Sequence, residues 1–203
     1  MDATAAPPDG AVPERSPVPG WGAVVRRRAV AVVVLAVVVV AALAWRIGAR
    51  AELAAFAWLG AAGSVLAVVD IAVKRLPDPI VLPSYGIGAA LLGAAVPFTE
   101  GGGARFLHAL IGMAALFAWF GSQWLIRPSA VGQGDVKLAG VLGLYLGWLG
   151  SAAWVLGVLA TAVLGAAVSG ALLAARRAGR ASAIPYGPFM LAGTLVAVLV
   201  HAP

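Results

Sequence analysis

Long apolar runs, separated by short polar joints, recur along most of this 203-residue sequence. A run of about 20 apolar residues is long enough to cross a membrane as a helix. With 62% hydrophobic and 11% charged residues, the chain has too little polar surface for a soluble domain of its size. The sequence therefore predicts an all-α, polytopic membrane helix bundle of about seven transmembrane helices. The runs lie at 29–45, 52–73, 80–98, 104–126, 136–149, 151–174 and 186–202.

The number of spans is open at two places. The fifth run is short and rich in glycine, so six or eight spans are alternatives. The first run, 29–45, would be roughly 25 Å long as a helix, enough for a thin hydrocarbon core. It could instead belong to a signal peptide, with Arg26-Arg27-Arg28 as its basic region and Ala42-Leu43-Ala44 as a small-residue cleavage site.

The composition changes along the chain divide it into three parts. Residues 1–21 contain five prolines and no apolar periodicity, which predicts a disordered cytoplasmic tail. Residues 22–50 are predicted to be an extra N-terminal transmembrane helix with its flanks. Residues 51–203 then form the main membrane domain.

The formal net charge of +6 comes from Lys and Arg residues clustered between the apolar runs. This pattern is typical of membrane flanks and predicts lipid, not nucleic acid, as the partner. If the N-terminus is cytoplasmic, eleven basic residues lie inside and three lie outside (Arg46, Arg50 and Arg105). The excess inside supports this orientation and the seven-span count.

The sequence contains no cysteine and two histidines. Disulfides, thiolate catalysis and cysteine-based zinc sites are therefore excluded. We expect neither a metal nor a cofactor.

Two of the eight acidic residues lie at the cytoplasmic edge of apolar runs. Asp70 ends the run WLGAAGSVLAVVD, about one turn inside the boundary, and Asp135 opens the fifth run. A carboxyl group at such a depth is costly and is by default a candidate for function. The alternative is that each acid caps a helix end or pairs with Lys74 or Lys137.

Two carboxyl groups at one depth can share a proton if their helices pack together, because like charges a few Å apart do not both ionise cheaply. The ionised group could take a proton from water while the protonated group donates to a peptide carbonyl. Such a pair would hydrolyse an amide without a covalent intermediate. Beside Asp135, we expect Gly132 and Gly134 to allow unusual backbone angles and a close approach of substrate.

Three segments resemble motifs of the type IV prepilin peptidases, the membrane aspartyl proteases that cut pilin leaders. GQGDVKLAGVLGLYLGW resembles the GxGD segment of that family. VVDIAVKRLPDPIVLP is similar to the segment in which a membrane-embedded Asp precedes a Pro-Asp/Asn turn. IPYGPFMLAG (184–193) is similar to the Pro-Phe-Gly-Pro that begins the last helix, with Tyr186 in place of Phe. Together these segments cover about 60–200.

The resemblance implies that Asp70 and Asp135 are the catalytic pair. Asp78 competes for the first role but lies in a Pro-containing turn, for which a structural or substrate-facing role is expected. Because residues i and i+2 do not share a helix face, Lys137 is expected to anchor its helix at the lipid headgroups and not to pair with Asp135. The remaining supporting residues are Gly132, Gly134, Pro77, Pro185, Tyr186, Gly187 and Pro188. Pro185 and Pro188 are expected to shape the start of the last helix, and Gly187 to allow close helix approach.

The resemblance also implies a bacterial cytoplasmic-membrane enzyme of pilus biogenesis or type II secretion. Its substrate would be a prepilin or pseudopilin, cleaved near the cytoplasmic face. Larger family members carry a cysteine-containing cytoplasmic domain that goes with N-methylation, so we expect peptidase activity without methyl transfer here. The sequence indicates no oligomeric state and does not identify the pilin class.

Three other classes are alternatives. A transporter could use paired acids for protons or cations, although its acids would lie nearer the midplane. A secretion scaffold would tolerate Asp70→Asn and Asp135→Asn. A protease of the presenilin or signal-peptide-peptidase type shares GxGD but would have a Tyr-Asp pair on the partner helix, where this chain has Val69 before Asp70.

Overall fold

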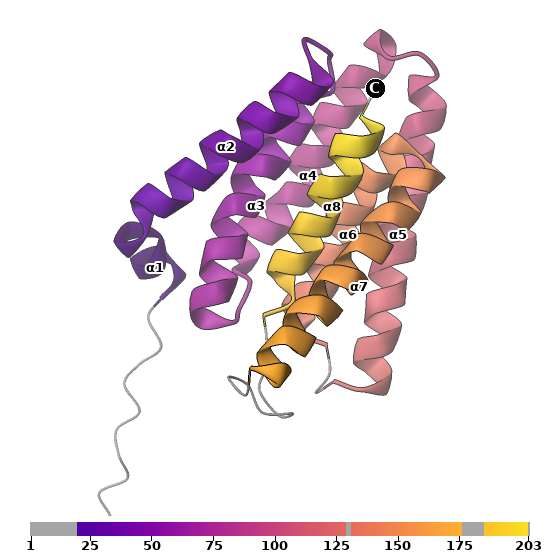
Figure 1. The fold of residues 1–203 in the computed structure, drawn as a ribbon. Helices are drawn as coiled ribbons and strands as arrows, with labels where there is room; N and C mark the ends of the chain where they lie inside the picture. The colour runs from indigo at the N-terminus through magenta and orange to yellow at the C-terminus, as the bar shows by residue number, and fades with distance from the viewer. Residues whose placement is uncertain (1–19, 129–130, 176–184, 203) are drawn as a thin grey trace, which may run out of the picture.

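A computed structural model describes residues 20–128, 131–175 and 185–202 (Figure 1). These residues form helices joined by short connections, and none of them lies in a strand. Seven long helices occupy the seven predicted apolar runs. The elements are α1 (Trp21–Arg27), α2 (Ala29–Ile47), α3 (Leu53–Val73), α4 (Asp78–Ala95), the 3-10 turn η1 (Val96–Phe98), α5 (Gly102–Ile126), α6 (Gln133–Leu149), α7 (Ser151–Ala174) and α8 (Gly187–His201).

The predicted disordered tail lies outside the described residues, except for its last two positions. Gly20 precedes α1, and Trp21 is the first residue of that helix. The sequence did not predict α1, because its seven residues are too few to show a helical apolar period. A break at Arg28 separates α1 from α2.

Among the described helices, five are long and apolar enough to cross a membrane, judged by length and composition: α2, α3, α4 with η1, α5 and α7. The other two long helices, α6 with 17 residues and α8 with 15, are shorter. The predicted fold class, a polytopic membrane helix bundle, is confirmed.

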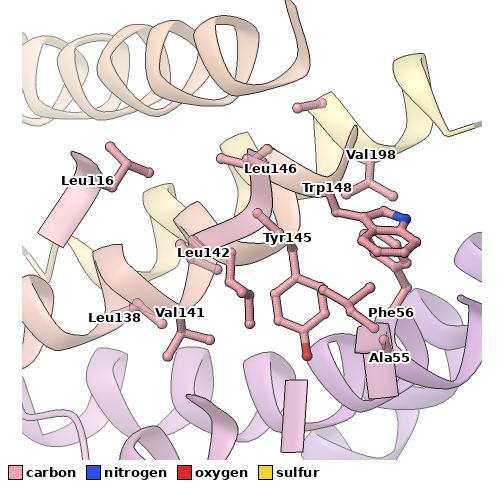
Figure 2. Packing of buried hydrophobic residues seen from close by; sticks show 14 of the residues in the cluster. Ala55, Phe56, Leu116, Leu138, Val141, Leu142, Tyr145, Leu146, Trp148 and Val198 are labelled. Atoms are coloured by element: carbon pink, nitrogen blue, oxygen red, sulfur yellow. The ribbon is translucent and has the colours of Figure 1, made fainter. Parts of the chain in front are cut away.

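Helix α6 is the centre of the bundle. From Leu138 to Trp148 every residue of α6 is buried, so the helix is surrounded by protein on all sides. Tyr145 packs edge-on against Phe56 of α3 with ring centroids 5.4 Å apart, as Figure 2 shows among the buried side chains. A helix enclosed in this way does not need the length or apolarity of a lipid-facing span.

Glycines allow α5 to approach α6 closely. A methyl group added at Gly112 of α5 would lie 2.6 Å from the carbonyl oxygen of Gly143 and 3.0 Å from the Cα of Gly147. Such contacts leave no room for any side chain at these positions. Backbones in direct contact are typical of helix packing in membranes, where small residues at the interface allow close approach.

The helices run back and forth between two ends of the bundle (Figure 1). At one end α3 finishes and α4, α6 and α8 begin; we call this the aspartate end, because Asp70 and Asp135 lie there. The opposite end holds the start of α3 and the last turns of α6 and α8. The sequence motifs at 70–79, 132–137 and 185–188 therefore meet at one end of the molecule.

Candidate active site

Asp70 lies in the last turn of α3 and is only 4% exposed. Its carbonyl oxygen accepts a hydrogen bond from the N–H of Lys74, which adopts a left-handed conformation with φ of 52° and ends the helix. The chain then reverses and α4 begins at Asp78, with Pro79 in its first turn. Proline fits there because the first turn of a helix has no partner for its N–H groups.

The start of α8 holds the carboxyl group of Asp70. The backbone N–H of Gly187 donates a hydrogen bond of 3.2 Å to Oδ2 of Asp70. A methyl group at Gly187 would lie 2.8 Å from the same oxygen. Glycine at this position therefore brings the backbone of α8 within hydrogen-bond distance of the carboxyl group.

Asp135 lies in the first turn of α6, which begins after Gly132. A methyl group at Gly132 would lie 3.1 Å from Oδ2 of Asp135, and one at Gly134 would lie 3.0 Å from the Cβ of Leu76. These glycines lie close to Asp135 and Leu76, and the close approach of substrate stays a prediction. The predicted unusual backbone angles are wrong: neither glycine has a positive φ, and Gly132 has φ of −73° and ψ of 144°.

Asp70 and Asp135 line the same cavity, of about 700 Å³, at the aspartate end. We call it the aspartate cavity. The loop Lys74–Pro79 forms one wall, and residues 132–135 form another. The two acids that the sequence analysis selected lie on separate helices, α3 and α6, and the fold brings them to one cavity.

An ion pair crosses the edge of this cavity. Nζ of Lys137 lies 2.8 Å from both Oδ1 and Oδ2 of Asp78, and so ties the first turn of α6 to the start of α4. The structure thus gives Lys137 a partner other than the expected lipid headgroups. Next to it, the hydroxyl of Tyr85 donates a 2.6 Å hydrogen bond to the carbonyl oxygen of Lys137. These contacts position the turn that carries Asp135.

The third motif places an aromatic ring beside the acids. Tyr186 comes just before α8 and packs against Phe120 of α5 and Phe189 of α8, with ring centroids 6.2 and 6.3 Å apart. Tyr186 and Asp135 line the same cavity, so Tyr186 belongs to the surroundings of that acid. Pro185 lies before the helix and Pro188 is in its first turn.

Sequence reasoning missed two residues of the site. Leu76 lies against both Gly134 and Gly187, where added methyl groups would be 3.0 Å from its Cβ and 3.5 Å from its Cδ2. Trp21 of α1 lines the aspartate cavity. Leu76 lies between Asp70 and Asp78 in the sequence, which could have indicated that it belongs to the site. Nothing near Trp21 in the sequence connects that residue with Asp70.

Within the part of the chain that the structure describes, no three His, Cys, Asp or Glu side chains come together as possible metal ligands. What the site does hold is a pair of carboxyl groups in a cavity, with one backbone N–H donating to Asp70. This set of groups is suited to general acid and base catalysis.

The sequence profile of the type IV leader peptidase family matches residues 53–174, which include Asp70 and Asp135. A prepilin leader peptidase/N-methyltransferase from Pseudomonas putida is 31% identical over 163 residues, 77% of this chain and 53% of its own length. One from Burkholderia pseudomallei (strain K96243) is 35% identical over 162 residues, 75% of this chain and 48% of its own length. The chain thus spans about half the length of these relatives. No solved structure matches significantly.

Proposed function

Because this chain belongs to the type IV leader peptidase family, we propose that it is an aspartic endopeptidase that removes the basic leader from prepilin-like proteins. Asp70 and Asp135 form the catalytic pair. The observation that carries the proposal is that these two acids, from α3 and α6, line one cavity. The family match covers both acids, which supports the assignment.

The proposed reaction needs one proton shared between the two carboxyl groups. Two carboxylates at close range do not both ionise cheaply, so one is a base while the other stays an acid. The base takes a proton from water, the resulting hydroxide adds to the peptide carbonyl carbon, and the acid protonates the carbonyl oxygen. When the tetrahedral intermediate collapses, the C–N bond breaks and the nitrogen receives a proton from a carboxyl group. No covalent bond to the enzyme forms.

Gly187 has a positioning role in this scheme. Its N–H holds Oδ2 of Asp70 and leaves Oδ1 to contact water or the substrate. Fixing one oxygen limits rotation of the carboxyl group, and correct orientation of a reacting group lowers the barrier of a reaction.

We further propose that the aspartate end faces the cytoplasm of a bacterium. The excess of Lys and Arg in the joints at this end supports the orientation, because cytoplasmic loops of membrane proteins are enriched in these residues. The leader of a prepilin lies on that side.

The relatives carry the names of two activities, and we propose that this 203-residue sequence carries the peptidase alone. In larger members of the family that this sequence resembles, methyl transfer goes with a domain that contains cysteine pairs. This sequence has no cysteine. Incubating the purified protein with cleaved substrate and a labelled methyl donor tests the point. Methyl transfer to the new N-terminus by this protein would refute it.

The proposed function is tested by cleavage in liposomes. The substrate has a basic leader followed by one apolar helix, and the enzymes compared are wild type, Asp70→Asn, Asp135→Asn and Asp78→Asn. We expect cleavage by wild type, a loss of at least a thousandfold in the first two variants, and a loss of no more than several-fold in the third, which loses only the ion pair with Lys137. Asp78→Asn is a matched control because it changes an acid in the same cavity. Cleavage that survives both Asp70→Asn and Asp135→Asn would exclude the two-aspartate mechanism.

A further inference from the structure

A second cavity, of about 530 Å³, meets Asp135 from the membrane side. Its floor is α6, and its walls are α5 on one side and α7 with α8 on the other. Helix α5 packs on α6, and α7 packs on α8, whereas α5 meets the other pair at separate points: Nε1 of Trp154 in α7 donates a hydrogen bond to the carbonyl oxygen of Gly112, and Phe120 contacts Tyr186. The gap between these walls is the groove that we call the α5–α7 groove.

The polarity of the groove changes along its length. At the aspartate end its lining includes Gln123, Asp135 and Tyr186; deeper in the bundle it includes Leu116 and Leu146. From Asp135 to Leu146 the floor is twelve residues of helix, a rise of roughly 16 Å in an α-helix. The groove is therefore about three helical turns long, polar beside Asp135 and mostly apolar deeper in the bundle, where Thr161 and Thr194 also line it.

The groove is open to lipid along its side. Trp119, which lines it from α5, is 60% exposed. Ala162 lines it from α7 and is also exposed. Both residues belong to helices that are long and apolar enough to cross a membrane, so the surface around them faces hydrocarbon. An apolar helix in the bilayer could reach the groove sideways.

We propose that the α5–α7 groove binds the first turns of the apolar helix that follows the cleavage site of the substrate. This inference rests on the proposed function. Asp135 lines both the groove and the aspartate cavity, so a chain lying in the groove would continue past the acids into the polar cavity. The substrate changes from a polar leader to an apolar helix near its cleavage site. The two cavities change from polar to mostly apolar at Asp135, which lines both of them.

Another apolar cavity, of about 240 Å³ between α2, α3 and α8, is a less suitable site for this helix. Neither aspartate lines it. A helix bound there would not end beside Asp70 or Asp135. It serves as the comparison site in the experiment below.

The groove is tested by disulfide trapping, which is clean because the sequence contains no cysteine. Single cysteines are placed at Ala162 in the groove, at Val163 and at Ala67 in the comparison cavity. Val163 is the matched control: it is the next residue of α7, is 65% exposed and does not line the groove. The partner is a synthetic substrate with a basic leader, an apolar helix and one cysteine in the first turns of that helix. All variants also carry Asp135→Asn, so that the substrate is not consumed.

The expected result is a cross-link from Ala162→Cys at least ten times stronger than from Val163→Cys or Ala67→Cys. Equal cross-linking at Ala162 and Val163 would mean random collision in lipid and would overturn the proposal. Preferred cross-linking at Ala67, or none from Ala162, would overturn it too. Since trapping does not depend on cleavage, a protein that binds the helix at Ala162 but never cleaves it would refute the proposed function and leave the groove in place.

A kinetic experiment tests the same groove in the active enzyme. Ala162→Trp fills the groove from an exposed position, and Val163→Trp adds the same ring toward lipid. We expect Ala162→Trp to raise KM at least tenfold for the full substrate and to leave cleavage of a short leader peptide, without the apolar helix, within twofold of wild type. Equal effects on both substrates, or on both variants, would contradict the assignment.

Discussion

The backbone N–H of Gly187 donates a hydrogen bond to Oδ2 of Asp70, although the two residues are 117 positions apart in the chain. Any side chain at Gly187 would meet this oxygen, because an added methyl group lies 2.8 Å from it. The start of the last helix is thus part of the surroundings of the buried acid. We propose that this contact positions Asp70, which would be a role for Gly187 beyond helix packing.

Gly187→Ala should therefore impair cleavage more than stability. The methyl group must push the Asp70 carboxyl group out of position, and we expect kcat to fall about 10- to 100-fold. The melting temperature in detergent should change by only a few degrees, since the displaced group is one side chain. Cleavage of the prepilin-like substrate and thermal unfolding are measured on the same preparation.

The control for this prediction is Gly170→Ala in α7, where an added methyl group meets nothing within 4 Å. It should leave kcat unchanged. If Gly187→Ala cleaves as fast as Gly170→Ala, the N–H of Gly187 does not position Asp70.

The ion pair between Lys137 and Asp78 should contribute little to stability and measurably to cleavage. Its side chains are 31% and 51% exposed, and exposed pairs contribute about 0.2–1 kcal/mol. Because the pair joins the turn carrying Asp135 to α4, Lys137→Met should lower kcat several-fold. The exchanged variant, Lys137→Asp with Asp78→Lys, should recover most of the loss. Failure of the exchange to recover activity, in a folded protein, would show that Lys137 acts in some way other than through Asp78.

The sequence predicted the seven long helices because each apolar run is bounded by glycine, proline or charged residues. It also indicated both aspartates, since a carboxyl group inside an apolar run is unusual. It did not predict α1, whose seven residues show no period, or the partner of Lys137, which lies 59 positions away. Spacing along one helix could exclude Asp135 as that partner, but only the packing of α4 against α6 brings Asp78 to it.

The glycines of α6 should differ in whether their substitution can be rescued. A methyl group at Gly140 would meet the side chain of Tyr85, 2.9 Å from its Cζ. One at Gly143 would meet the backbone of α5, 3.0 Å from the Cα of Met113. Overpacking of this kind costs about 1–3 kcal/mol. Thermal unfolding should show that Tyr85→Ala recovers part of the loss in Gly140→Ala but none of the loss in Gly143→Ala. Equal recovery in both would contradict the packing described for Tyr85.

The proposed orientation predicts which residues a membrane-impermeant thiol reagent reaches. Single cysteines replace Glu100, in the joint between α4 and α5, and Arg127, at the end of α5; both residues are exposed. In intact cells we expect labelling of Glu100→Cys and not of Arg127→Cys. Permeabilised cells are the control, in which both should react. The reverse pattern in intact cells would place the aspartate end outside and refute cleavage at the cytoplasmic face.

Tyr186 stands where the resembling family has Phe, and the structure separates the roles of its ring and its hydroxyl. The ring packs on Phe120 and Phe189, whereas no hydrogen bond of the hydroxyl is found among the described residues. Tyr186→Phe should therefore keep cleavage within about threefold of wild type. Tyr186→Ala removes both ring contacts beside Asp135 and should lower the melting temperature as well as kcat, because truncating a packed aromatic side chain typically costs several kcal/mol. A loss in Tyr186→Phe as large as that in Tyr186→Ala would instead assign the hydroxyl a direct part in the reaction, such as donating to the carbonyl oxygen of the substrate.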